Sequence, residues 1–229
     1  MKLFYYFISA LFAVFANEYY SQFGQDKFVN ETYFKGKIGG VFLEIGAYDG
    51  LSLSNTYFFE KNLGWTGVCV EPSPSIYKKL LNNRVCHCLE GAISDYNGIA
   101  RFCFLQNIPM LSGIEKDYHP LHVIRINQEM KVLKGSKIFF DINVYSFNSM
   151  MEMYDLTHID FLSLDTEGGE DKILKSIDFD KYTIDVMTVE FNYGNKMKDF
   201  FHSKGYVEVK KIGSDYIFAR KAFLDSLED

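Results

Sequence analysis

The chain has 229 residues, of which 48% are hydrophobic and 24% are charged, and this length favours one well-cored domain over two. Its formal net charge is −6, and its Lys and Arg residues are scattered along the chain. This pattern argues against nucleic acid as the main partner, because phosphate backbones are bound by clustered basic residues.

The N-terminus differs from the rest of the chain. A basic start is followed by an uncharged run from Leu3 to Ala16 that ends in small residues. Residues 1–16 are typical of a secretory signal peptide and are short for a transmembrane helix. An uncleaved signal-anchor and an apolar helix packed on the domain of residues 17–229 are the alternatives. A functional signal implies the secretory pathway or the extracellular space, with membrane contact only through an uncleaved segment; otherwise a cytoplasmic location is expected.

A polar cluster follows this segment. Residues Tyr19–Phe34 predict a short helix that leads into the first strand. Ser21, Gln22, Gln25 and Asp26 stand immediately before that helix, where polar side chains commonly serve as a cap.

The stretch Gly39–Ser54 is the one around which we expect the chain to be organised. Its short apolar run, Val41 to Ile45, ends in a glycine-rich turn, which is typical of a buried parallel strand that turns into a helix. Glycines let the backbone lie close to a ligand, and the start of a helix presents free N–H groups. The pattern predicts a nucleotide-sized pocket formed by Glu44, Gly46, Ala47, Tyr48, Asp49 and Gly50.

This turn differs from the dinucleotide fingerprint, in which three glycines are spaced G-x-G-x-x-G. Here Gly46 and Gly50 stand four residues apart, and Glu44 precedes the first glycine by two. A carboxylate at that place repels a pyrophosphate but suits a ligand with a cationic amino-acid end and a ribose. The spacing favours S-adenosylmethionine over a dinucleotide, although similar glycine-rich units also occur as plain folding devices.

An acidic residue ends the next predicted strand. A helix over Ser52–Asn62 leads to a strand over Thr66–Val70, which stops at Glu71 and Pro72. A carboxylate at the tip of the second strand is placed to accept hydrogen bonds from both ribose hydroxyls. The alternative is a solvated glutamate at the end of a strand.

The third predicted strand, Val85–Leu89, follows a helix that runs to about Asn82 and is itself followed by small and apolar residues. Such residues beyond a strand tip offer a slot for a flat ring. We expect the adenine beside Ala92 and Ile93, with Ser94 or Asp95 available to its amino group, although an ordinary turn uses the same residue types.

The four cysteines leave the cellular compartment open. Cys69, Cys86, Cys88 and Cys103 all fall in predicted strands, and the C-x-C spacing differs from the C-x-x-C of zinc and redox sites. We expect buried free thiols. The alternative, if the chain is exported, is a bridge from Cys69 to Cys86 or Cys88.

The alternation of strand and helix is interrupted over residues 98–145. Two predicted strands, Gly98–Leu105 and Lys137–Tyr145, flank an insertion at about 104–137 that contains a helical stretch, Val123–Leu133. Insertions at the carboxyl edge of a parallel sheet often carry binding and catalytic residues, so substrate specificity is expected here. His119 and His122 are candidate bases within it, against the alternative of ordinary surface side chains.

Three carboxylates crowd a second strand-to-helix junction. A predicted strand over Asp160–Leu164 is followed by a glycine pair that opens a helix ending at Ser176. Asp165 is expected to face the place where the methyl group leaves the donor. Glu167 and Glu170 have helix capping as the alternative role, which we favour for Glu170.

The C-terminal part predicts how the sheet ends. A strand over Ile184–Phe191 and a helix over about Asn195–Ser203 precede a hairpin of Gly205–Ile212 and Ser214–Ala219. An antiparallel pair that closes a mostly parallel sheet predicts the Rossmann-like methyltransferase fold, an α/β fold with seven strands.

From Tyr20 to about Ala219 the chain resembles the FkbM family of S-adenosylmethionine-dependent methyltransferases. The matching segments are SQFGQDKF at 21–28, FLEIGAYDGLSLSNTYFFEKNLGWTGVCVEPSP at 42–74, GAISD at 91–95, LSG at 111–113 and IDFLSLDTEGGE at 159–170. The resemblance implies O-methylation, often of a sugar hydroxyl on a glycan or a glycosylated natural product, with the donor held by Glu44, Gly46 and Glu71. The family usually has valine at the position of Thr166 and often alanine at that of Gly169, and neither difference removes a carboxylate.

A sulfonium donor already carries a good leaving group, so the enzyme must align the acceptor and remove its proton. The candidate bases are Asp165, His119 and His122. Glu167 is expected to orient the acceptor, together with Glu190 and Asn192, or to bind a divalent ion through oxygen. We do not expect a metal.

Two other functions remain open. One is a catalytically inactive, secreted or membrane-anchored binding module on the same fold, against which the intact Glu44, Glu71 and Asp165 argue. The other is an NAD(P)-dependent sugar-modifying enzyme, which the glycine spacing disfavours.

Overall fold

The computed structural model describes residues 18–193 and 197–228. The predicted signal peptide, residues 1–16, lies outside this range, as does the predicted helix start at Asn195. No helix in the described ranges combines the length and the apolar character needed to cross a membrane.

Within the described residues, seven strands form one mixed sheet in the order β10-β11-β9-β8-β1-β2-β3. Neighbouring strands are parallel from β9 through β3, and β11 is antiparallel to both β9 and β10. The predicted methyltransferase-type sheet with its C-terminal hairpin is therefore confirmed. The strands are β1 (Val41–Ile45), β2 (Thr66–Glu71), β3 (His87–Glu90), β8 (His158–Leu164), β9 (Thr183–Glu190), β10 (Tyr206–Ile212) and β11 (Asp215–Arg220).

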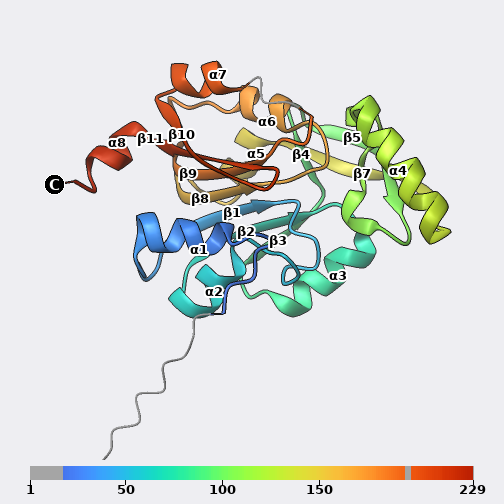
Figure 1. The fold of residues 1–229 in the computed structure, drawn as a ribbon, viewed down its shortest axis with the longest axis horizontal. Helices are drawn as coiled ribbons and strands as arrows, with labels where there is room; N and C mark the ends of the chain where they lie inside the picture. The colour runs from blue at the N-terminus through green and yellow to red at the C-terminus, as the bar shows by residue number, and fades with distance from the viewer. Residues whose placement is uncertain (1–17, 194–196, 229) are drawn as a thin grey trace, which may run out of the picture.

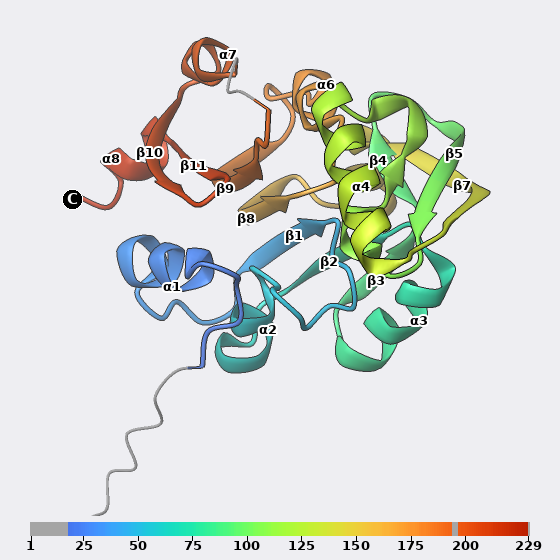
Figure 2. The same ribbon diagram turned by 45° about the vertical axis from the view of Figure 1, so that its right-hand side comes forward.

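Helices cover both faces of this sheet, as Figures 1 and 2 show. One face carries α1 (Gln25–Val29), the π-helical turn η1 (Asn30–Phe34), α2 (Tyr57–Leu63) and α3 (Pro74–Asn83). The other carries α5 (Phe147–Met153), α6 (Glu170–Ser176) and α7 (Lys198–Ser203), and α8 (Lys221–Asp225) follows β11 at the C-terminal end.

Side chains along each strand point alternately to the two faces of the sheet, and this alternation explains the two hydrophobic layers. In β1, Phe42 packs with the aromatic side chains of η1 and α2, whereas Leu43 packs with residues of α5 and α6 on the opposite face. Both side chains are completely buried. An apolar strand that is buried on both faces is the pattern of a central strand in a parallel sheet.

A second sheet is formed by the part of the chain that interrupts the alternation. In the described residues its order is β4-β7-β5-β6, and Figures 1 and 2 show α4 beside β5 and β7. Its elements are β4 (Ala92–Ser94), β5 (Gly98–Leu105), the 3₁₀ turn η2 (Pro109–Leu111), β6 (Gly113–Ile114), the 3₁₀ turn η3 (Glu115–Asp117), α4 (Pro120–Leu133) and β7 (Lys137–Ser146).

Two sequence-based expectations about this architecture were wrong. The helix predicted from Ser52 begins only at Tyr57. The side chains of Ser54 and Thr56 donate hydrogen bonds to Glu44, and these contacts hold the backbone before Tyr57 outside the helix. Residues 92–94, for which the sequence predicted no strand, form a strand that pairs in parallel with β7. The sequence offered no sign of this pairing, because the partner strand lies about fifty residues further along the chain.

Candidate functional site

A cavity opens at the carboxyl edge of the main sheet. Glu44 and Gly46 at the end of β1, Glu71 at the end of β2, Asp165 after β8 and Glu190 at the end of β9 all line it. Parallel strands bring residues that are far apart in sequence to one edge, which is where ligands bind in open α/β sheets.

Gly46 brings three strand ends together. Its N–H and that of Ala47 both donate to the carbonyl of Val70 in β2, at 3.1 and 2.9 Å. Gly46 has φ 85°, and a Cβ at this position would overlap the main-chain carbonyl of Asp165. Any larger residue would therefore push β1 away from the segment that follows β8.

The rest of the glycine turn divides into residues that line the cavity and residues that shape the turn. Ala47 and Tyr48 line the cavity, and Tyr48 takes a left-handed conformation with φ 52°. Asp49 does not line it; its carboxylate accepts hydrogen bonds from Ser52 and folds the turn. Gly50 lies behind the turn, against the side chain of Arg84.

Glu44 is buried, and its charge is already compensated. Its carboxylate accepts hydrogen bonds from Ser54 Oγ, Thr56 Oγ1 and the Asn55 N–H at 2.7 to 3.0 Å. Arg84 Nη1 lies 3.0 Å from Oε2. These contacts hold the segment 54–56 against the cavity. Glu44 also lines the cavity, so its direct contact with the donor stays a prediction.

Asn55 is the member of that segment with a free acceptor. Its N–H donates to Glu44 and its Nδ2 donates to Ser163 Oγ at 2.9 Å. Its Oδ1 is buried and has no hydrogen-bond partner among the described residues, and Asn55 lines the cavity. A buried acceptor without a donor carries a free-energy cost that a ligand N–H group can remove.

Arg84 holds the other side of Glu44. It also forms an ion pair with Glu60 and donates to Thr56 Oγ1 at 2.9 Å, and both carboxylates are nearly excluded from solvent. The sequence analysis did not identify Arg84, because it lies in an unremarkable polar stretch 40 residues after Glu44.

Glu71 is buried at the tip of β2 and lines the cavity. Its Oε1 accepts a hydrogen bond from the Ser73 N–H at 2.8 Å. Burial raises its pKa to about 8, an effect that hydrogen bonds from the Ser73 and Tyr48 backbone only partly oppose. Glu71 therefore has the place expected of a ribose-binding carboxylate, and among the described residues it has no ion pair like that between Arg84 and Glu44.

An apolar slot adjoins the cavity where the adenine was predicted. It shares Gly46, Pro72 and Thr166 with the cavity. Its other lining residues include Ala92 and Ile93, the two predicted positions, and Ile114 from β6. Ser94 is buried and does not line the slot, and its hydroxyl donates to Asp95 Oδ1 at 3.2 Å.

Three carboxylates meet where the cavity reaches β8 and β9. One oxygen each of Asp165, Glu167 and Glu190 lies within 4.8 Å of the others. Burial, followed by the charges of Glu190 and Glu167, raises the pKa of Asp165, and burial followed by Glu190 raises that of Glu167 to about 8.

Glu167 and Glu170 have different roles in the loop after β8. Glu170 Oε1 accepts hydrogen bonds from Thr166 and from the Gly168 N–H, so it caps this loop as favoured from the sequence. Glu167 adopts φ 58°, and its buried Oε2 has no hydrogen bond among the described residues. Its nearest basic atom is His122 Nδ1 at 3.5 Å.

The two candidate histidines lie in different surroundings. His119 is exposed, begins α4 as its N-cap, and stacks on the ring of Tyr193. His122 is buried, with Nε2 3.3 Å from the Leu111 carbonyl and Nδ1 3.3 Å from the Tyr193 hydroxyl. Burial lowers the pKa of His122, so it is a neutral partner of Glu167 at pH 7.

The N-terminal polar cluster reaches the cavity, which the sequence analysis had regarded only as a helix cap. Gln22 and Gln25 both line it, and Gln25 Nε2 donates to Asp215 Oδ2 at the start of β11. Asp215, which the sequence analysis missed, also lines the cavity, and burial raises its pKa to about 6.

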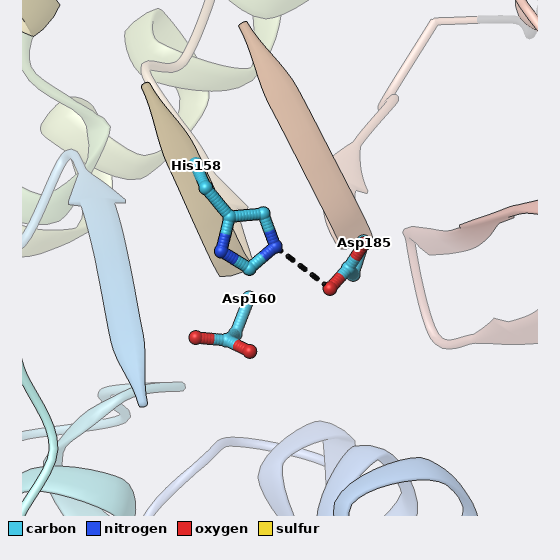
Figure 3. A group of neighbouring side chains, drawn as sticks. All are labelled: His158, Asp160 and Asp185. Atoms are coloured by element: carbon cyan, nitrogen blue, oxygen red, sulfur yellow. Dashed lines mark hydrogen bonds and ion pairs between the residues drawn. The ribbon is translucent and has the colours of Figure 1, made fainter. Parts of the chain in front are cut away.

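Another group of titratable side chains lies at the opposite edge of the sheet, near the amino ends of β8 and β9 (Figure 3). Asp185 binds His158 Nε2 at 2.9 Å and Arg220 Nη2 at 2.7 Å. Asp160 binds Lys37 Nζ at 2.6 Å and the Val41 N–H at 2.7 Å. These ion pairs join the two strands to neighbouring elements and leave no carboxylate uncompensated.

A seven-stranded sheet of this order, with an acidic cavity at its carboxyl edge, defines a Rossmann-like methyltransferase. The Methyltransferase FkbM domain matches residues 44–208, and the chain belongs to this family. Ser21–Asp26 and Asp215 lie outside the matched residues.

Two solved structures are similar to this chain. A methyltransferase from Pyrococcus furiosus shares 15% identity, covers 91% of each chain and has a TM-score of 0.41. A precorrin-6y C5,15-methyltransferase from Geobacter metallireducens GS-15 shares 12% identity, covers 81% of each chain and has a TM-score of 0.36. No curated protein sequence matches this chain at a significant level.

Replacing Arg84 tests the buried ion pairs. Arg84→Met keeps much of the side-chain volume but leaves Glu44 and Glu60 buried without a cation, so the free energy of unfolding should fall by about 3–5 kcal/mol. Arg101→Met is the control: it removes an exposed ion pair with Glu115 and should cost less than about 1 kcal/mol. Urea unfolding at pH 7 measures both, and an Arg84→Met protein as stable as the wild type would contradict this assignment.

The raised pKa of Glu71 predicts how the stability of the protein depends on pH. The folded protein binds this proton more tightly than the unfolded chain between pH 4.5 and about 8, so the contribution of Glu71 to stability falls as the pH rises through that window. Each unit of pKa shift corresponds to about 1.4 kcal/mol. Glu71→Gln cannot titrate and should lose stability less steeply over this range.

The matched control for this experiment is Glu90→Gln, which changes an exposed carboxylate on the neighbouring strand and should keep the wild-type slope. Urea unfolding at a series of pH values gives the slopes. Equal slopes for wild type and Glu71→Gln would show that Glu71 titrates normally.

Proposed function

We propose that this protein is an S-adenosylmethionine-dependent O-methyltransferase that acts on a hydroxyl of a sugar, a glycan or a glycosylated metabolite. The observation that carries the proposal is the cavity in which Glu71, Asn55 and Asp165 meet beneath the Gly46 turn of an FkbM-family domain. When bound, S-adenosylmethionine supplies a methyl group on a sulfonium leaving group.

The lining residues fit the separate parts of this donor. Glu71 suits the two ribose hydroxyls, because each can donate a hydrogen bond to an oxygen of its carboxyl group. The free Oδ1 of Asn55 suits an ammonium group. The slot beside Ala92, Ile93 and Ile114 suits a flat aromatic ring such as adenine.

Glu44 supports this site by positioning a neighbouring segment of the chain. Because its carboxylate is bound by Arg84 and by the segment 54–56, we assign it a positioning role: it aims Asn55 into the cavity. The N-terminal glutamines and Asp215 line the cavity with further hydrogen-bonding groups, which suit an acceptor rich in hydroxyls.

Asp165 is the favoured general base. It is open to the cavity, and its raised pKa makes it a better proton acceptor than an ordinary aspartate. One oxygen of Glu190 lies within 4.8 Å of one of Asp165, so the two carboxyl groups face the same part of the cavity. Glu167 and the neutral His122 hold the other side of this cluster.

The acceptor side supports a neutral substrate. Glu167, Glu190 and Asp165 line this part of the cavity with carboxyl oxygens, which disfavour an anionic phosphate or carboxylate. A neutral sugar hydroxyl carries no such charge. If residues 1–16 act as a signal peptide, the acceptor is a glycan or metabolite of the secretory pathway.

Isotope transfer tests the activity and the base together. Candidate glycans are incubated with S-adenosylmethionine labelled in its methyl group, and mass spectrometry measures label incorporation. Asp165→Asn should lower turnover by about 10²–10⁴-fold, because the amide cannot accept the proton. Its affinity for S-adenosylhomocysteine should stay close to that of the wild type.

Asp171→Asn is the control, since Asp171 is an exposed carboxylate of α6 that pairs with Lys175, and it should leave turnover unchanged. Full turnover in Asp165→Asn with intact donor binding would eliminate Asp165 as the base. Absence of label from every acceptor, despite bound S-adenosylhomocysteine, would favour the inactive binding module.

A further inference from the structure

Three thiols lie together between β2 and β3, on the face of the sheet covered by α2 and α3. Cys69 in β2 is buried, whereas Cys86, just before β3, and Cys88, within β3, are partly exposed. The Sγ atoms of Cys69 and Cys86 are 3.6 Å apart. We propose that Cys86 and Cys69 form a redox-active pair that a small-molecule disulfide, such as oxidised glutathione, converts to a bridge between β2 and the start of β3.

The geometry selects Cys86 over Cys88 as the partner of Cys69. Cys88 is the register neighbour of Cys69 in the sheet, but its Sγ contacts the Cys86 carbonyl oxygen at 3.7 Å. Among the described residues, Cys86 Sγ is the sulfur that contacts Cys69 Sγ. A disulfide has an S–S bond of about 2.05 Å, so the two sulfurs must approach from 3.6 Å by a small side-chain adjustment.

The backbone around Cys86 is already fixed in place. The N–H groups of Val85 and Cys86 donate to Glu60 Oε1 at 2.7 and 2.8 Å. These bonds keep the Cys86 side chain directed at β2, so little conformational freedom remains to be lost when the bridge forms.

The two sulfurs differ in reactivity. Contacts with the Cys69 and Cys88 thiols, with a further contribution from the Arg84 charge, lower the pKa of the Cys86 thiol. Burial raises the pKa of the Cys69 thiol. Because the thiolate is the nucleophile, the partly exposed Cys86 reacts first with a dissolved oxidant, and Cys69 resolves the product.

The reaction balances as two exchanges. The Cys86 thiolate attacks one sulfur of oxidised glutathione, breaks its S–S bond and releases one glutathione thiolate. Cys69 then loses its proton to solvent and attacks the Cys86 sulfur of the mixed disulfide, which releases the second glutathione thiolate. The two protein thiols are oxidised by two electrons, and the glutathione disulfide is reduced to two thiols.

The bridge would form beside the buried charges that support the cavity. Cys69 Sγ lies 3.8 Å from Glu44 Oε2, and Arg84 stands two residues before Cys86. Oxidation would tie the segment that carries Arg84 to β2. This inference does not depend on the proposed methyl transfer.

Thiol mapping of the full chain tests the pair. The protein is equilibrated over a range of reduced-to-oxidised glutathione ratios, free thiols are alkylated, and tryptic peptides are analysed by mass spectrometry. We expect the peptide 62–78, which holds Cys69, to become linked to the peptide 85–101. Since the second peptide holds both Cys86 and Cys88, fragmentation must locate the alkyl group on Cys88.

Single variants complete the test. Cys88→Ser and Cys103→Ser should form the same bridge as the wild type, whereas Cys86→Ser should leave Cys69 alkylated at every glutathione ratio. Three results would overturn the proposal: four alkylated cysteines in oxidised wild type, a bridge from Cys69 to Cys88 in place of Cys86, or an unchanged degree of cross-linking in Cys86→Ser. The wild-type mapping stands by itself if a variant fails to fold.

Discussion

The buried guanidinium of Arg84 is the interaction on which the donor side of the site depends. It forms ion pairs with both Glu44 and Glu60, and all three side chains are nearly excluded from solvent. Without this cation, the two carboxylates would carry a large desolvation cost. With it, Glu44 accepts hydrogen bonds from the segment 54–56, so the β1 turn and the start of α2 face one cavity.

Three other carboxyl groups that line the cavity have raised pKa values. Burial is the largest cause of the raised pKa of Glu71, Asp165 and Glu167, and at Glu167 the charge of Arg125 only partly opposes it. Tyr48 and Glu167 also hold left-handed backbone conformations beside the cavity. Strain and uncompensated charge at one edge of the sheet are the features expected where a protein is arranged around a ligand.

Much of this arrangement followed from local sequence patterns. The short apolar strand before the Gly46 turn, the glutamate that ends β2 and the carboxylates that follow β8 all stand at strand tips, and parallel strands bring such tips to one edge. The predicted hairpin at the C-terminus indicated the methyltransferase form of the sheet. These features depend on residues close together in the chain, and they are therefore visible in sequence.

The features that sequence analysis missed depend on contacts between distant residues. Arg84 gains its role only because the end of α3 lies against Glu44, and Asp215 enters the cavity only because β11 inserts beside β9. The sequence indicated a helix cap at Gln25, whereas its side chain contacts Asp215, which lies 190 residues further along the chain. No local pattern distinguishes these residues from ordinary polar residues, because their partners are set by the tertiary fold.

The central claim is that the cavity beneath the Gly46 turn holds a sulfonium nucleoside, and calorimetric titration tests it most directly. The wild-type protein is titrated with S-adenosylhomocysteine and, separately, with NAD, and the first titration is repeated with Glu71→Gln. We expect one site for S-adenosylhomocysteine, no binding of NAD, and an affinity about tenfold or more weaker in the variant, since one of the two carboxyl oxygens becomes an amide NH₂ group that cannot accept a hydrogen bond. Binding of NAD alone, or equal affinity of both proteins for S-adenosylhomocysteine, would contradict the account.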